Sequence, residues 1–277
     1  MRAFMAALAL AVLTGCATDM PEPAAPSATG AGQEAKWKME RLKADCMKQK
    51  GFKYTPFVMS GPKETEAQKK MAAGDYAATK EVRAKYGYRI FSQFVYPDDS
   101  ASGALVVEEH GQDDPNPGAR MNETQFNAYK KAEDACMAKA FKAVLNKDVK
   151  NRMDVFKMHF DLKKQLTTRR LDGDAELVRL AATFGDCLKG KGYAIISLKP
   201  SDLAGRGEKA MLAQVKKIEK EQGTQLWPDL TAAQARPYLA KEIKDALEDL
   251  ECGKEFYARY SPMSTAVDQE VEAQLPL

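Results

Sequence analysis

The segment DCMKQKGF (residues 45–52) returns later in the chain as DCLKGKGY (residues 186–193). Five of its eight positions are identical, and two more hold similar side chains. In both copies a helical pattern ends at a glycine, Gly51 or Gly192, which suits the left-handed residue that commonly closes a helix. The repeated segment therefore predicts two helices that end in the same way and carry a cysteine near that end.

The sequence before each copy has the spacing of an amphipathic helix. Apolar side chains recur there three or four residues apart, at Ala35, Met39, Leu42 and Cys46 and again at Leu177, Leu180, Phe184 and Cys187. This spacing predicts one helix over residues 33–50 and another over residues 174–189. Because each cysteine lies on the apolar face, we expect both sulfur atoms to be buried.

Two further similarities follow the repeated segment in the same order. EVRAKYG (81–87) corresponds to KIEKEQG (217–223), and AEDAC (132–136) corresponds to LEDLEC (247–252). This order predicts a tandem duplication of about 110 to 130 residues. We expect a first helical repeat over residues 34–146, with an inserted loop and β segment, and a second helical repeat over residues 147–277.

The rest of the pattern predicts a mainly α fold with minor β structure. In the first half, further helices are expected over residues 63–86, with a break near Gly74, and from a capping box at Asn122 and Gln125 to about residue 145. A stripe at Val149, Met153, Phe156 and Phe160 predicts the next helix. Later helices are expected over residues 207–222, over residues 237–258 with Pro237 in the first turn, and shortly after Pro262. The segments YRIFSQFVY (88–96) and ALVVEE (104–109) are rich in β-formers and predict a hairpin.

Four cysteines lie in these predicted helices: Cys46, Cys136, Cys187 and Cys252. An even number outside the cytoplasm indicates two disulfides, and spacing alone does not choose among the three pairings. If the halves are related, the simplest pairing is Cys46–Cys136 with Cys187–Cys252, which holds each half with one disulfide. The alternative joins the halves through Cys46–Cys187 and Cys136–Cys252. A zinc site is disfavoured, because close cysteine pairs are lacking and only His110 and His159 could add ligands.

The first sixteen residues read MRAFMAALALAVLTGC. Arg2 precedes an apolar run over residues 3–13, which is typical of a signal peptide and too short to span a bilayer. LTGC (13–16) resembles a bacterial lipobox. The resemblance implies a signal peptide over residues 1–15, cleavage before Cys16 and a diacylglycerol on the Cys16 thiol.

Two acyl chains hold a protein stably on a membrane. Residues 17–33 are rich in proline and glycine, so we expect residues 16–33 to form a lipidated cysteine with a flexible tether. An aspartate after the cysteine would suggest retention at an inner membrane. Ala17 stands there instead, which favours the outer membrane if the cell has one.

The lipobox and the repeated C-[ML]-x-x-x-G-[FY] segments together resemble a group of secreted bacterial lipoproteins that is common in actinobacteria. The matching residues are 13–16, 46–52 and 187–193. The resemblance implies a location in the cell envelope and the repeated layout. The group has no established activity, so the resemblance implies no mechanism.

Charge is balanced overall, with 42 basic and 39 acidic residues, which argues against a nucleic-acid-binding protein. Locally, the stretch from Lys139 to Arg170 holds ten basic residues and only three acidic ones, whereas the C-terminal segment from Lys241 is acidic. The basic run could meet anionic envelope polymers or lipid head groups. Alternatively, the basic and acidic helices show solvated faces that partly neutralise each other.

Motifs that would name a reaction are lacking. The chain has no G-x-S-x-G, H-E-x-x-H, P-loop or dinucleotide-binding pattern, so we expect no catalytic residue, metal or cofactor. The acidic DGDAE segment (172–176) fits a helix–helix turn with a capping aspartate better than a calcium loop. Trp37 and Trp227 could stack on sugars, although packing is the simpler role for isolated tryptophans.

These observations predict a lipid-anchored protein of the cell envelope that acts as a binding or interaction module. Its expected partners are the membrane, through the anchor, and an envelope protein or anionic polymer. An alternative is an envelope enzyme whose catalytic carboxylates spacing does not reveal. A cleft with two converging acids of shifted pKa would favour that alternative. A third possibility is a purely structural spacer.

Overall fold

The computed structural model describes residues 28–59, 64–104, 115–116, 121–224 and 227–276. The predicted signal peptide, Cys16 and most of the predicted tether lie outside these residues, as does His110. The helices are α1 (Ala28–Gln49), α2 (Glu66–Ala72), α3 (Tyr76–Tyr86), α4 (Ser92–Val95), α5 (Glu123–Leu145), α6 (Arg152–Arg170), α7 (Ala175–Gly190), α8 (Pro200–Ala204), α9 (Arg206–Gln222), α10 (Ala232–Cys252) and α11 (Lys254–Gln274), with a 3-10 turn at Ser100–Ser102. The expectation of a mainly α fold is confirmed.

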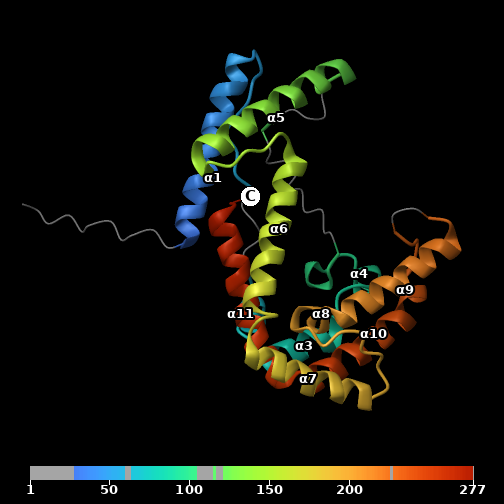
Figure 1. The fold of residues 1–277 in the computed structure, drawn as a ribbon. Coiled ribbons are helices and arrows are strands. Elements are labelled where there is room, and N and C mark those ends of the chain that lie inside the picture. Colours follow the sequence, from blue (N-terminus) through green and yellow to red (C-terminus); the bar gives the residue numbers. More distant parts are fainter. Residues whose placement is uncertain (1–27, 60–63, 105–114, 117–120, 225–226, 277) are drawn as a thin grey trace, which may run out of the picture.

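Figure 1 shows α1 and α5 at one end of the molecule and α7 to α10 at the other. The long helices α6 and α11 contact each other and run between the two ends. At one end α1 packs against α5, and at the other α3 and α4 pack against α10. Segments from both predicted repeats therefore share the packing around α10.

The largest hydrophobic core lies among α7, α10 and α11. Its members include Leu177, Phe184, Leu250, Phe256 and Val267, all buried. A smaller core between α1, α5 and α6 is built from Met39, Ala140, Phe141, Val149 and Val155. None of the described helices combines the length and the apolar character that crossing a membrane requires.

The two copies of the repeated segment close their helices with the same hydrogen bonds. Gly51 and Gly192 have positive φ angles of 83° and 89°. The N–H of Phe52 donates to the carbonyl of Met47 at 3.0 Å, and the N–H of Tyr193 donates to the carbonyl of Leu188 at 3.0 Å. The predicted helix ends are confirmed, whereas the duplication of the whole halves stays a prediction.

Helix α1 begins earlier than the sequence predicts. It starts at Ala28, so residues 28–33 of the predicted tether are helical. Gly32 is buried, and a Cβ atom there would lie 3.7 Å from the carbonyl oxygen of Glu272 on α11. Packing against the end of α11 extends α1 through a segment whose glycines would weaken an isolated helix.

The strand predicted at residues 88–96 is wrong, and no strand occurs in the described part of the chain. Its N–H groups have other acceptors: Glu242 accepts hydrogen bonds from Ile90 and Phe91, at 2.9 and 2.8 Å. The chain then turns into α4. The second predicted strand, residues 104–109, lies outside the described residues except for Ala104, which is not in a strand.

Both prolines expected near helix starts lie inside helices. Helix α10 begins at Ala232, five residues before Pro237. Its N-cap Thr231 forms a capping box with Gln234 in the first turn. Helix α11 continues through Pro262. Proline removes the hydrogen bond to the carbonyl four residues earlier, which for Pro262 is that of Ala258. Gly74 lies directly against that carbonyl, where a Cβ atom would come within 2.9 Å.

Candidate functional site

Each end of the molecule is held by one disulfide. Cys46 of α1 is bonded to Cys136 of α5, and Cys187 of α7 is bonded to Cys252 of α10. This is the pairing expected from related halves. Cys46 is buried as expected and Cys136 is buried too, but Cys187, for which burial was also expected, is exposed. The buried face of α7 runs through Phe184 and on to Leu188, so Cys187 lies at its edge.

A groove of about 600 Å³ opens between α1, α5 and the first turns of α6. The segment at residues 54–59, which has no regular secondary structure, also lines the groove. Helix α1 lines it with Lys36, Met39, Glu40 and Lys43, whose spacing of three or four residues places them on one helix face. The lining side chains of α5 follow the same rule, from Phe126 through Lys130, Glu133 and Met137 to Phe141.

The groove has an apolar floor. Met39, Phe141 and Val155 are buried there and belong to the core between α1, α5 and α6. At the opening, Phe126 and Phe156 remain 39% and 52% exposed. Exposed aromatic side chains around an apolar hollow are typical of a surface that meets another molecule.

The outer face of α6 adjoins the groove. The predicted stripe of Val149, Met153, Phe156 and Phe160 lies only in part on a helix, because Val149 precedes α6 and is buried. The other three side chains are on α6 but exposed, whereas Val155 and Leu166 are buried. Apolar residues lie on two faces of this helix, and sequence spacing alone did not show which face is buried. Only Phe156 of the exposed stripe lines the groove.

A network of ion pairs crosses the groove wall. Lys43 lies 3.0 Å from a carboxylate oxygen of Glu40 and 3.5 Å from one of Glu133. Glu133 also pairs with Lys130 at 2.6 Å. Glu40 accepts further hydrogen bonds from the Tyr54 hydroxyl at 2.7 Å and from the N–H of Phe57 at 3.2 Å. The two carboxylates of the groove are therefore fully engaged.

The charges in this network follow from its partners. Burial acts to raise the pKa of Glu133, but the hydrogen bond from Lys130 and the charges of Lys43, Lys130 and Arg152 hold that pKa below its ordinary value. Burial and the hydrogen bond to Glu40 raise the pKa of Tyr54. At neutral pH Glu133 is a charged carboxylate and Tyr54 is a neutral phenol. A carboxylate with a lowered pKa is a poor general acid.

Other polar side chains of the groove are also paired. Asn116 accepts a hydrogen bond from the N–H of Thr55 at 2.8 Å and donates to its carbonyl at 3.0 Å. Lys36 forms an ion pair with Glu272 at 2.7 Å. Arg152 is exposed and forms no ion pair with a described residue, although its charge helps to lower the pKa of Glu133. It is therefore the cation of the lining that is available to a ligand.

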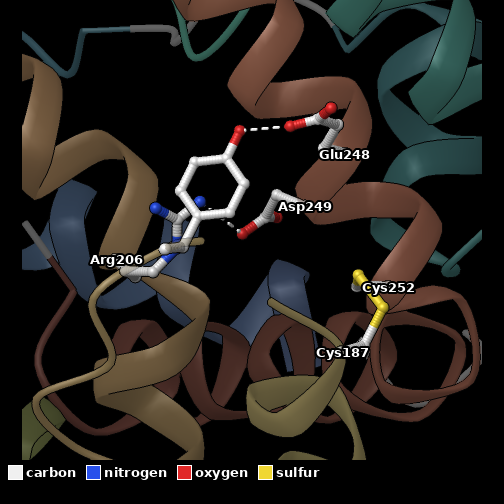
Figure 2. The surroundings of a disulfide bond; sticks show 6 residues. Cys187, Arg206, Glu248, Asp249 and Cys252 are labelled. Atoms are coloured by element: carbon white, nitrogen blue, oxygen red, sulfur yellow. Dashed lines mark hydrogen bonds and ion pairs between the residues drawn. A yellow bond between two sulfur atoms is a disulfide. The ribbon is translucent and has the colours of Figure 1, made fainter. Parts of the chain in front are cut away.

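A second polar cluster lies at the other end of the molecule, on one face of α10. Glu242, Asp245 and Asp249 are all buried there. Asp249 pairs with Arg83 at 2.8 Å and with Arg206 at 3.2 Å. Figure 2 shows Glu248, Asp249 and Cys252 along α10, with Arg206 facing Asp249.

Tyrosines and backbone groups complete this cluster. The hydroxyl of Tyr88 donates to Asp245 at 2.7 Å, and that of Tyr257 donates to Asp249 at 2.7 Å. Burial raises the pKa of Glu242, and its hydrogen bonds from backbone N–H groups act in the opposite direction. These contacts join α3, α9, α10 and α11. The acids converge as an enzyme site would require, but each is bound by arginines, tyrosines or backbone amides, and none lines the groove.

The structure places the remaining predicted residues in ordinary structural roles. Asp174 caps α7 and pairs with Arg259. Trp227 stacks on Phe94, with ring centroids 5.9 Å apart, and Trp37 is partly exposed on α1. His159 is half-buried on α6. No group of three or more His, Cys, Asp or Glu side chains is placed to hold a metal ion in the described part of the chain.

The basic run and the acidic C-terminal segment meet. Lys163 of α6 pairs with Asp268 of α11 at 2.8 Å, and Arg170 pairs with Glu270. Both pairs are partly solvated. This contact agrees with the interpretation that the two charged faces neutralise each other in part.

Sequence reasoning missed the groove. Its one visible signal was the presence of Glu40, Lys43 and Glu133 next to the apolar stripes of the predicted helices at residues 33–50 and 122–145. No family model matches the chain, and neither a curated protein nor a solved structure was found to match it.

Proposed function

We propose that this protein is a lipid-anchored binding module of the cell envelope, and that the groove between α1, α5 and α6 is its binding site. The groove is the observation that carries this proposal. The lipobox at residues 13–16 supports the anchor, and two disulfides are compatible with a location outside the cytoplasm.

The groove has the properties of a ligand site. Its volume of about 600 Å³ lies within the range of about 300–1,000 Å³ that ligand pockets occupy. Its walls are two helices joined by the Cys46–Cys136 disulfide and by Lys43, which contacts carboxylates on both helices. A site on rigid helices needs little ordering when a ligand binds.

The state of the carboxylates favours binding over acid–base catalysis. Glu40 and Glu133 in the groove are ion-paired, and the pKa of Glu133 is lowered. General acid catalysis at neutral pH needs a carboxyl group with a raised pKa instead.

The binding site can be tested in intact cells by photo-crosslinking of the full chain. A photoreactive amino acid would replace Met137, which lines the groove, or Met153, which is 71% exposed on α6 outside it. We expect a discrete adduct from position 137 and none from position 153. Equal adducts at both positions, or none at position 137, would contradict a binding site in the groove.

The anchor is tested separately with Cys16→Ser. We expect the wild-type chain to incorporate labelled palmitate and to sediment with membranes, and the variant to do neither. Membrane association of the variant equal to that of the wild type would refute an anchor on Cys16 while leaving the groove experiment unaffected.

A further inference from the structure

We infer that the groove binds a single acyl chain that carries an anionic head group, with the chain on the apolar floor and the head group at Arg152. This inference rests on the proposed function, because it names the ligand class of the same site. Free fatty acids and anionic lysophospholipids share this chemistry.

The groove has little free hydrogen-bonding capacity for a polar ligand. A peptide or a sugar brings many donors and acceptors that need partners once they are buried. Apart from Arg152, the charged and amide side chains of the lining are paired within the protein. Glu40 is used by Lys43, Tyr54 and Phe57, and Asn116 by Thr55. An acyl chain requires no hydrogen bonds and can fill such a space without leaving polar groups unpaired.

The apolar lining of the groove is rich in methionine. Met39 is buried on the floor, Met137 is half-buried, and Met59 is exposed at the edge of the groove. Methionine is flexible and polarisable, so it adapts to a chain of variable conformation. Phe57 and Phe156 add aromatic surface to the lining, from the segment at residues 54–59 and from α6.

The charges of the lining favour an anionic ligand group. Four cationic side chains line the groove, Lys36, Lys43, Lys130 and Arg152, against the two carboxylates of Glu40 and Glu133. The lysines are paired with carboxylates of the protein. Arg152 is the first residue of α6, where the partial positive charge of the helix end also favours an anion. The anionic group of a ligand would therefore lie beside Arg152.

Calorimetric titration of the full chain carrying Cys16→Ser tests this inference, since this substitution removes the proposed anchor and leaves the groove intact. The probes are dodecanoate, tetradecanoate, dodecanoyl lysophosphatidylglycerol and neutral dodecanol, each below its micelle concentration. We expect saturable binding of one chain per protein. Two additional CH₂ groups should tighten binding roughly 15-fold between dodecanoate and tetradecanoate. If dodecanoate binds more tightly, the ligand is a free fatty acid. If dodecanoyl lysophosphatidylglycerol binds more tightly, the ligand is a lysophospholipid.

Two matched pairs of variants locate the binding. Met137→Trp fills the groove and should abolish binding, whereas Met153→Trp, on the exposed face of α6, should not. If Met137→Trp proves unfolded by circular dichroism, Phe156→Ala and Phe160→Ala serve instead. Both side chains are more than half exposed, but only Phe156 lines the groove, so only its removal should weaken binding.

Arg152→Gln tests the head group. It should weaken dodecanoate roughly 2- to 5-fold, as expected for an exposed ion pair, and leave dodecanol unchanged. Absence of saturable binding by both fatty acids, or equal affinity in the groove-filled variant, overturns the inference. If that occurs while the groove position still gives a discrete crosslink in cells, the proposed binding function stands and only the ligand class is wrong.

Discussion

Glu40 of α1 and Glu133 of α5 share the ammonium group of Lys43, which lies 3.0 Å from the first carboxylate and 3.5 Å from the second. The side chains of all three are less than a fifth exposed. The same two helices are joined further along by the Cys46–Cys136 disulfide. One covalent and one ionic link thus fix the separation of the helices that wall the groove.

Removing one of these carboxylates should destabilise the protein in a pH-dependent way. Glu133→Gln should lower the free energy of unfolding by about 1–2 kcal/mol at pH 7, because it leaves Lys43 and Lys130 less well paired. The folded state lowers the pKa of Glu133. Its stabilisation is therefore present above the pKa of the unfolded chain, near 4.3, and is lost as the pH falls through the lower folded value.

Urea unfolding of wild type and Glu133→Gln between pH 7 and pH 3 checks this expectation. The two stabilities should converge at the acid end. Glu66→Gln is the control, since Glu66 forms an exposed pair with Lys69 and should change stability little at any pH. A difference between wild type and Glu133→Gln that grows towards pH 3 would show that Glu133 is not held as a charged partner.

The buried cluster on α10 should be much more sensitive than a surface ion pair. Asp249 is fully buried against Arg83 and Arg206, so Asp249→Asn removes the carboxylate that pairs with Arg83 and one of the two carboxylates, with Asp245, that pair with Arg206. We expect a loss of about 3–5 kcal/mol in unfolding free energy. Asp186→Asn, which disrupts an exposed pair with Lys189, should cost less than about 1 kcal/mol. Similar losses for the two variants in chemical denaturation would contradict a structural role for the cluster.

Alanine should lower the stability of the protein at one helical glycine, Gly207, but not at another, Gly190. A Cβ atom at Gly207 would lie 2.0 Å from the ring of Tyr88, which the α10 cluster holds in place. Gly207→Ala should therefore lower the melting temperature by several degrees. A Cβ atom at Gly190 meets no atom within 4 Å, so Gly190→Ala should leave stability unchanged or raise it slightly. Thermal melts decide, and a Gly207→Ala variant as stable as Gly190→Ala would show that Tyr88 is free to move.

The two disulfides should differ in their response to reductant. Cys187 is exposed, whereas Cys46 and Cys136 are buried. A thiolate must reach a sulfur atom to open a disulfide. Under native conditions, brief treatment with dithiothreitol followed by alkylation and mass spectrometry should therefore label Cys187 and Cys252 first. Earlier labelling of Cys46 and Cys136 would mean that α1 and α5 separate readily.

The local features of the fold were largely accessible from sequence. The capping glycines Gly51 and Gly192 and the capping box at Asn122 follow from residue types at short spacing, and the structure confirms them. The cysteine pairing came instead from the assumption of related halves, because spacing left three pairings open, and the structure has that pairing. Failures occurred where tertiary contacts override a local preference. Residues 88–96 have strand-forming side chains, but the buried carboxylate of Glu242 binds the N–H groups of Ile90 and Phe91.

The site was less accessible than the fold. The groove combines one face each of α1, α5 and α6 with the segment at residues 54–59, and sequence spacing gives no angle between helices. Met153, Phe156 and Phe160 indicated a helix correctly, yet which of its faces is buried depends on how α11 packs against it. The paired state of Glu40 and Glu133 likewise depends on Lys43 lying between two helices.

Hydrogen–deuterium exchange of the full chain carrying Cys16→Ser, with and without tetradecanoate, measures the proposed binding site most directly, because it needs no change in the groove. The account predicts slower exchange over residues 36–43, 130–141 and 152–156, with unchanged exchange in α7 and α10. Protection confined to α7 and α10, or no protection at all at saturating tetradecanoate, would contradict it.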